Sequence, residues 1–313
     1  LLGIALSHPG SFPVGKVDFL TLLPMNFYEF LMAHNEDMLC DYLHKLHPNK
    51  MVSDLFLQKL EGYLRSYYIT GGMPEVVSKW IDTKDVMVVE QVQQAILDSY
   101  ELDFAKHAPV KDYPKLSLVW HSIPEQLARE NSKFVFGHVK RGMRARDLED
   151  ALGWLINAGL VYKVTKIETP LIPLSAYADQ THFKLYMADV GLLRRMARLP
   201  SEALLAGGDT YRQFKGALTE NYVLCELVSL QEDVPFYWKS GNTAEVDFVV
   251  QFGMDIVPLE VKSEYNTRAR SMAEYRKKYT PRVSVKTSLN NVSGEEVRNI
   301  PLYLLWKLKD YIK

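Results

Sequence analysis

Apolar residues recur at helical spacing through the first third of the chain. Two segments, residues 54–68 and 86–106, place apolar side chains three or four positions apart, as an amphipathic helix with one core-facing side requires. In the second segment these positions are Val89, Val92, Ile96, Tyr100 and Phe104. We therefore expect a helical bundle over residues 32–112, preceded by the edge of an α/β layer in residues 1–31.

The sequence between the two helical segments predicts a tight corner. Residues 69–77 contain Gly71 and Gly72, which allow backbone angles that other residues avoid. Pro74 follows them and suits the first turn of a helix. One helix should therefore end near the glycines, and the next should begin at the proline.

A different order of elements follows in residues 113–200. Two helical segments, residues 120–130 and 146–157, precede two strand-like stretches, residues 160–164 and 183–187, which a polar, proline-containing loop separates. Helix, helix, strand, long loop and strand is the order of a winged helix-turn-helix. This segment is therefore predicted to be a winged helix.

The last region, residues 205–313, alternates between helices and strands. It contains helical segments near residues 213–230 and 269–279. Its strand-like stretches are residues 235–238, 244–251, 255–261, 282–286 and 301–305. This order predicts an α/β sandwich, so the whole chain is expected to be an α/β multidomain protein.

Asp247, Glu260 and Lys262 form the sharpest group of chemically active residues. Gly253 and Met254 can turn the chain back as a hairpin, which would bring Asp247 beside Glu260 on the neighbouring strand. Two adjacent carboxylates are a site suited to Mg²⁺, and a lysine beside them could orient a metal-bound water. The alternative is an exposed ion-pair cluster, but the strongly apolar strands around these charges favour a metal site.

Two groups of basic residues suggest contact with phosphates. One lies at the start of the predicted second helix of the winged helix and contains Lys140, Arg144 and Arg146. The other follows the acid and lysine motif and contains Arg276, Lys277 and Lys278. The alternative for the first group is a winged helix that serves as a spacer or a protein-docking domain, and the alternative for the second is an ordinary solvated helix face. Both are therefore candidate nucleic-acid-binding surfaces.

Charge, cysteine content and length narrow the picture. The 37 lysines and arginines nearly cancel the 38 aspartates and glutamates, so attraction to a polyanion must come from local clusters. Cys40 and Cys225 are too few for a disulfide framework and are expected as packed thiols in the cytoplasm. No apolar run reaches the roughly 18 residues of a membrane span. The 313 residues allow two or three domains, each with its own core.

Several motifs together resemble a known family. Residues 216–223, 245–247 and 260–262 resemble the PD-(D/E)XK nuclease-like domain that ends a large prokaryotic group of AAA+ ATPases. Residues 68–75 look like the helical-domain signature of that group, and residues 11–30 look like its last ATPase strand. The resemblance therefore extends over most of the chain.

The resemblance implies roles for individual residues. Asp247 and Glu260 would be ligands of Mg²⁺ or Mn²⁺, Lys262 the catalytic lysine, and Glu220 the helix-borne acid that completes the site. Val246 stands where the name of the nuclease family has proline.

The resemblance also implies a domain order and a missing part. The chain contains no G-x-x-x-x-G-K-[ST] sequence, so ATP would bind only to a longer protein whose Walker motifs precede Leu1. The expected domains are the end of an AAA+ core (1–31), a helical lid (32–112), a winged helix (113–200) and a nuclease-like domain (205–313).

Three functions remain open at this stage. The first is metal-dependent phosphodiester hydrolysis on nucleic acid. The second is a catalytically silent nuclease fold that serves as an interaction module switched by the ATPase. The third is a DNA-binding regulator that depends on Arg144 and Arg146. The expected partners are nucleic acid, a protein partner or further copies of the chain, with no membrane.

Overall fold

The computed structural model describes most of the chain. The described residues are 18, 20–129, 133–206, 212–231, 233–241, 244–265 and 270–312. The predicted end of an ATPase core lies largely before Asp18 and thus outside the described residues. Among the described helices, none is both long and apolar enough to cross a lipid bilayer.

Helices form the first third of the structure, as predicted. They are α2 (Phe27–Ala33), α3 (Asp37–Lys45), α4 (Asp54–Thr70), α5 (Pro74–Thr83) and α6 (Val86–His107). The side chain of Asn26 caps α2 and Glu29 closes a capping box, which satisfies amide groups that have no partner within the helix. The predicted helices at residues 54–68 and 86–106 are confirmed as α4 and α6.

The middle of the chain contains the predicted helices and the predicted strand pair. Its elements are α7 (Tyr113–Leu127), α8 (Phe136–Val139), α9 (Ala145–Asn157), β1 (Val161–Ile167), β2 (Ala178–Met187), α10 (Val190–Met196) and α11 (Ser201–Ala206). β1 and β2 pair antiparallel. Gly159, with φ at 71°, ends the turn after α9, where left-handed backbone favours glycine.

The last third alternates helices and strands. Its elements are α12 (Arg212–Gln231), β3 (Phe236–Ser240), β4 (Ala244–Phe252), β5 (Asp255–Val261), α13 (Arg270–Tyr279), β6 (Val285–Ser288), β7 (Arg298–Pro301), a 3₁₀ helix (Leu302–Lys307) and α14 (Leu308–Tyr311). The predicted strand at residues 301–305 is wrong, because this segment is mostly 3₁₀ helix. A short, continuously apolar run cannot be assigned by periodicity alone.

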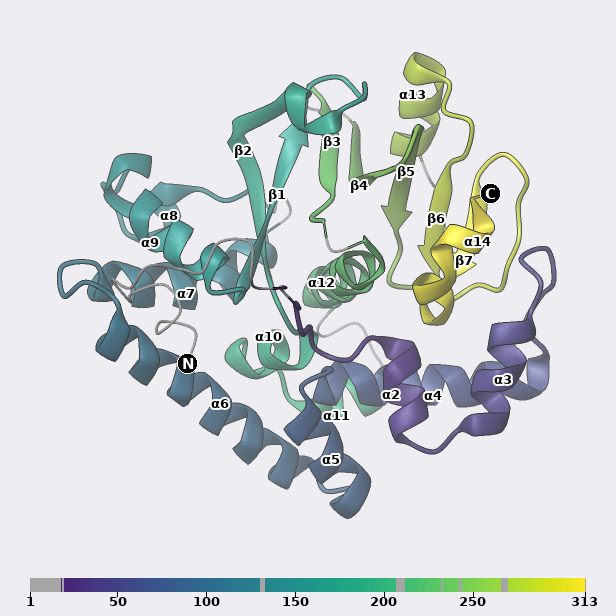
Figure 1. The fold of residues 1–313 in the computed structure, drawn as a ribbon, viewed down its shortest axis with the longest axis horizontal. Coiled ribbons are helices and arrows are strands. Elements are labelled where there is room, and N and C mark those ends of the chain that lie inside the picture. The colour runs from purple at the N-terminus through teal and green to yellow at the C-terminus, as the bar shows by residue number, and fades with distance from the viewer. Residues whose placement is uncertain are drawn as a thin grey trace.

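The strands join in one seven-stranded mixed sheet in the order β2-β1-β3-β4-β5-β6-β7. β1 pairs parallel with β3 through Lys166 opposite Tyr237 and Ile167 opposite Trp238. The hairpin of the predicted winged helix therefore continues the C-terminal sheet instead of forming a separate wing. The α/β fold class is confirmed, and Figure 1 shows the sheet above the helices of the first third.

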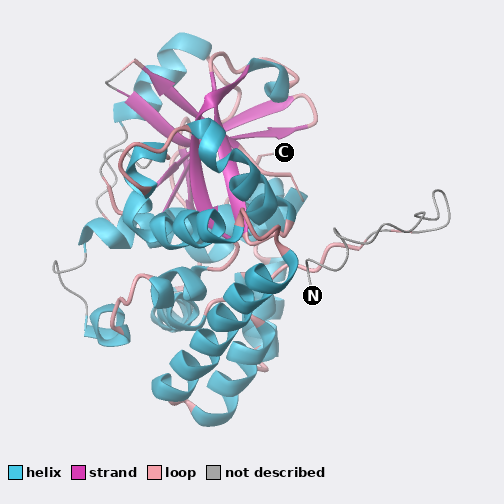
Figure 2. Cartoon of the chain, turned by 90° about the vertical axis from the view of Figure 1, so that its left-hand side faces the viewer, coloured by secondary structure: helices cyan, strands magenta, loops and turns pink. Residues whose placement is uncertain are grey.

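One buried cluster connects nearly all of these elements. It contains residues from Phe27 in α2 to Ile312 after α14, and a smaller cluster fills the space between α13 and the sheet. The expectation of separate domain cores is therefore wrong for the described residues. Figure 2, a view from the side, shows the same two layers, with the strands on one side and the long helices packed against them.

The predicted corner at Gly71 and Gly72 lies where α4, α5 and α10 meet. Gly71 has φ at 70°, and a Cβ added to it would lie 2.1 Å from Asp189 Oδ1. The N–H of Gly72 donates to Asp189 Oδ2 at 2.7 Å. Glycine is therefore required at Gly71 both by the backbone angle and by the close approach of α10.

A divided acidic site and its buried lysine

Asp247 lies at an irregularity in β4. Phe236 pairs with Val249 and Trp238 pairs with Val246. Between these two pairs β4 contains one more residue than β3, which makes a β-bulge. Val246 and Val249 pack in the cluster under α13, whereas Phe248 packs in the main core. The bulge therefore turns Asp247 toward the face of the sheet that α12 covers.

The carboxyl of Asp247 is enclosed among other charged groups. Its Oδ2 accepts a hydrogen bond of 2.7 Å from the N–H of Val261 on the neighbouring strand β5. Loss of hydration raises the pKa of Asp247 to about 8, and Glu220 acts in the same direction, while Lys184 opposes them. Burial next to Glu220 therefore makes Asp247 a weaker acid than a solvent-exposed aspartate.

Lys184 is the residue that the sequence analysis missed at this site. Its side chain, on β2, is 2% exposed, and its Nζ lies 2.6 Å from Glu245 Oε1 and 3.6 Å from Glu220 Oε2. Loss of hydration lowers the pKa of Lys184, but Tyr186 and the surrounding carboxylates outweigh it and hold that pKa well above its usual value. The lysine is therefore a buried, charged group.

The acids around Lys184 have further partners. The hydroxyl of Tyr186 donates to Glu220 Oε2 at 2.8 Å. Lys239 Nζ lies 3.1 Å from Glu245 Oε2. Loss of hydration raises the pKa of Glu245, but Lys184 and then Lys239 outweigh it, so the pKa lies below its usual value. Glu220 and Glu245 are thus already compensated by cations of the protein.

Glu260 and Lys262 lie on the other face of the sheet. Leu259 and Val261 pack in the main core, and alternation along β5 therefore turns Glu260 to the side of α13. Glu260 is 3% exposed, and its Oε1 lies 2.7 Å from Lys262 Nζ. Lys286 is paired with Glu260 in register on β6. Glu260 Oε2 is buried without a hydrogen-bond partner among the described residues.

The four predicted site residues therefore form two pairs instead of one cluster. Glu220 lies near Asp247, and Glu260 lies next to Lys262, with the sheet between the pairs. Within the described part of the chain, no group of three or more carboxylate, histidine or cysteine side chains is suited to a metal ion. The alternation along β4 and β5 therefore places the two implied ligands, Asp247 and Glu260, on different faces of the sheet.

A close inspection of the sequence could have found Lys184. It stands in the stretch Phe183-Lys184-Leu185-Tyr186-Met187, where an isolated charge in an apolar strand calls for a buried partner. The bulge at Asp247 gives no comparable sign, because Val246, Phe248 and Val249 are all apolar and fit either face of a sheet.

The two predicted nucleic-acid-binding groups lie on different parts of the molecule. Lys140, Arg144 and Arg146 are exposed at and before the start of α9, whereas the basic residues of α13 lie over the sheet on the other side of the structure (Figure 1). Arg276 pairs with Glu296 at 2.7 Å, and Lys278 lies over the ring of Tyr279. Phosphate binding at either group stays a prediction.

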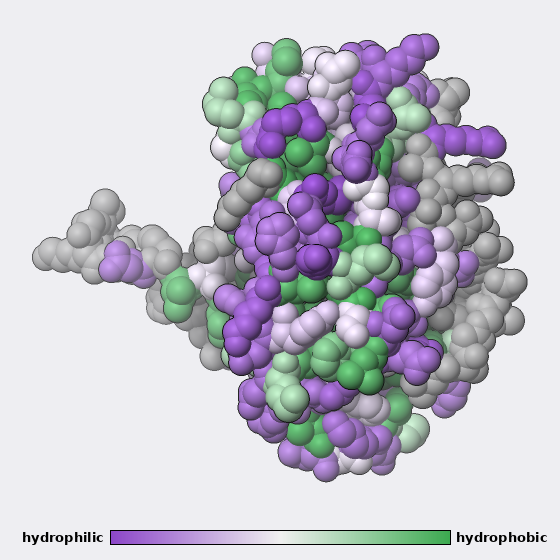
Figure 3. All heavy atoms as spheres, turned by 90° about the vertical axis from the view of Figure 1, so that its right-hand side faces the viewer, coloured by the Kyte–Doolittle hydropathy of each residue, from purple (hydrophilic) through white to green (hydrophobic). Residues whose placement is uncertain are grey.

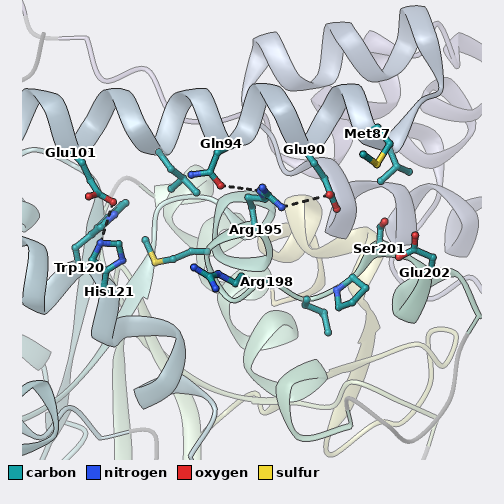
Figure 4. Close-up of a pocket in the computed structure, with 15 residues that line it drawn as sticks. Met87, Glu90, Gln94, Glu101, Trp120, His121, Arg195, Arg198, Ser201 and Glu202 are labelled. Carbon is teal, nitrogen blue, oxygen red and sulfur yellow. Dashed lines mark hydrogen bonds and ion pairs between the residues drawn. The ribbon is translucent and has the colours of Figure 1, made fainter.

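A separate cavity of about 700 Å³ lies between α6, α7 and the end of α10. Arg195 crosses it to contact Gln94 at 3.1 Å and Glu90 at 3.5 Å, and His121 lies 3.1 Å from Glu101 (Figure 4). Its polar groups are largely paired with one another. None of the predicted site residues lines this cavity.

Comparison with known proteins gives two family matches. Residues 61–203 match a domain of unknown function, DUF8612. Residues 215–305 match another domain of unknown function, DUF4143, which is found in AAA-ATPase-associated proteins. No curated protein and no solved structure matches the chain.

Proposed function

We propose that this chain is a non-catalytic part of an AAA-ATPase-associated protein, in which a nuclease-like α/β fold serves as a rigid interaction module. The observation that carries the proposal is the separation of the acids by the sheet. Mg²⁺ holds its ligands at about 2.0–2.1 Å, so Asp247 and Glu260 on opposite faces are a poor pair for one ion. Lys184 also compensates Glu220 and Glu245 without any metal.

Close packing between residues 61–203 and residues 215–305, the two segments with family matches, further supports an interaction module that moves as one rigid body. Asn221, on α12, donates from its Nδ2 to the carbonyl of Met187 at 3.0 Å, and its Oδ1 accepts from the N–H of Met187 at 2.8 Å. Both residues are buried. This two-way pair joins the end of β2 to the first helix of the DUF4143 segment.

Arg194 joins the helical bundle to α10. Its guanidinium donates to the carbonyls of Ile69 at 3.2 Å and Leu199 at 2.9 Å, and to Gln93 Oε1 at 3.0 Å. It also pairs with Glu90 Oε1 at 2.9 Å, and its side chain is 1% exposed. The corner after α4 is therefore fixed to both α6 and α10.

The start and end of the described chain are joined in the same way. The N–H of Phe27, at the start of α2, donates to Glu226 Oε1 on α12 at 2.7 Å. Lys307 donates to the carbonyls of His44 at 2.6 Å and Leu46 at 2.7 Å, which lie at and just after the end of α3. A displacement that an ATPase imposed on α2 would thus reach the C-terminal sheet without a flexible joint.

The alternative function is metal-dependent phosphodiester hydrolysis, and the closeness of Glu220 and Asp247 is the observation that favours it. Nicking of supercoiled plasmid and of single-stranded oligonucleotides in Mg²⁺ or Mn²⁺ separates the two. We expect no nicking above that of Asp247→Ala prepared identically. Nicking by the wild-type chain that is lost in both Asp247→Ala and Lys262→Ala would overturn the proposal in favour of the nuclease.

A further inference from the structure

Lys184 reaches the acidic group from a strand that is distant in the sheet order. It lies on β2, whereas Glu245 and Asp247 lie on β4 and Glu220 on α12. β1 and β3 are joined through only two residue pairs, at Lys166 and Ile167. The other residues of β1 do not pair with β3. The side chain of Lys184 extends from β2 toward β4, where its Nζ contacts Glu245.

The ammonium group is held in a fixed position. It has an ion pair to Glu245 at 2.6 Å, a second to Glu220 at 3.6 Å, and lies 5.3 Å from the centre of the Tyr237 ring. An aromatic face attracts a cation in such a geometry. Because the side chain is 2% exposed, it has no route to solvent without opening of the packing around it.

The local charges balance without an added ion. Glu220 and Glu245 carry the negative charges that face Lys184, and Lys239 compensates Glu245 from the outer side at 3.1 Å. A divalent ion placed here would meet two cations of the protein at short range. A buried charge that loses its partner is strongly destabilising, so the acids need a cation in this position.

We infer that Lys184 is a built-in cation that takes the place of a divalent metal among Glu220, Glu245 and Asp247. This inference rests on the proposed non-catalytic function. It also goes one step further, because it predicts that removal of one ammonium group creates a divalent-cation site among described residues that hold no such group of ligands in the wild-type chain. Lys184 is thus a positioning residue that holds α12 against β4 by charge.

The test compares the wild-type chain with Lys184→Met, using Mn²⁺ alone as the probe. Methionine keeps most of the length and apolar volume of lysine but removes the charge. Lys239→Met is the matched control, because Lys239 also pairs with Glu245 but is 25% exposed and leaves Lys184 in place. Isothermal calorimetry measures Mn²⁺ binding, and thermal melting measures stability with and without Mn²⁺.

We expect saturable binding of one Mn²⁺ per chain in Lys184→Met, together with a melting temperature that Mn²⁺ raises by several degrees. The wild-type chain and Lys239→Met should show neither effect. If Lys184→Met is unfolded without metal, Mn²⁺ added during refolding should restore the fold, and failure to restore it would overturn the inference.

Two other outcomes separate this inference from the proposed function. A folded Lys184→Met that binds no Mn²⁺, beside a wild-type chain that neither binds Mn²⁺ nor nicks DNA, would overturn the role of Lys184 alone. A wild-type chain that binds Mn²⁺ as tightly as the variant and nicks DNA would overturn both.

Discussion

Replacement of Arg194 by methionine tests whether the helical bundle and α10 form one body. The wild-type guanidinium makes four hydrogen bonds of 2.9–3.2 Å while its side chain is 1% exposed. Methionine fills much of the same volume but leaves Glu90 and the carbonyls of Ile69 and Leu199 without this donor. Breaking a buried, hydrogen-bonded ion pair in this way costs about 3–5 kcal/mol.

Arg195 supplies the control, because it also contacts Glu90, at 3.5 Å, but is 30% exposed. Arg195→Met should cost about 1 kcal/mol or less, as for other exposed pairs. Urea unfolding monitored by circular dichroism gives the midpoint and slope for both variants. In Arg194→Met/Glu90→Gln, part of the lost stability should return, because the side chain that loses its 2.9 Å partner is then uncharged.

Equal midpoints for Arg194→Met and Arg195→Met would contradict the role assigned to the Arg194 guanidinium. So would a double variant that is less stable than Arg194→Met alone. Either result would mean that the corner after α4 is held by apolar packing and not by the guanidinium.

Three further predictions concern the same interlocked core. Gly71→Ala should destabilise the chain by several kcal/mol in urea unfolding, because φ is positive and the added Cβ would lie 2.1 Å from a carboxylate oxygen. Gly137→Ala is the control and should not destabilise the chain, because nothing lies within 4 Å of its added Cβ. Burial raises the pKa of Glu226 from 4.5 to about 8, so the folded chain binds more protons than the unfolded chain between these values and loses stability as pH rises through them. Glu226→Gln should remove a slope of at most about 1.4 kcal/mol per pH unit from midpoints measured across that window, and an unchanged slope would contradict the assignment. Lys307→Met should increase amide hydrogen exchange at the end of α3, because three backbone carbonyls there lose a charged donor, and unchanged exchange would mean that apolar contacts alone hold α3.

Much of the secondary structure could be predicted because its apolar patterns are regular. The helices α4 and α6 follow their 3.6-residue periods, and β4 and β5 fall close to their predicted bounds. The corner at Gly71 and Gly72 also follows from the sequence, because few residues other than glycine tolerate such backbone angles. These features depend on residues close together in the sequence, and the spacing of apolar residues and glycines is enough to predict them.

The arrangement of these elements could not be predicted in the same way. The joining of β1 to β3 depends on two residue pairs between segments about 70 positions apart, and nothing local marks them. Figure 3 shows that polar and apolar side chains are interspersed over one face of the molecule, so exposed segments carry little information on which elements meet inside.

The candidate site shows the same limit. The alternation of β5 correctly places Glu260 and Lys262 on one side, since Lys262 Nζ contacts Glu260 Oε1. The side on which Asp247 lies depends on a single extra residue in β4, which reverses the side for everything beyond it. The same acids and lysine at the same sequence spacing are therefore compatible with either one site or two.

Diffraction from crystals grown with Mn²⁺ would show whether the acids hold a metal ion, because anomalous scattering locates the ion without any assumption about activity. We expect no Mn²⁺ bound to Asp247, with Lys184 Nζ still in contact with Glu245. A Mn²⁺ ion bridging Asp247 and Glu260, with Lys184 displaced from Glu245, would contradict the non-catalytic scaffold and would support the nuclease.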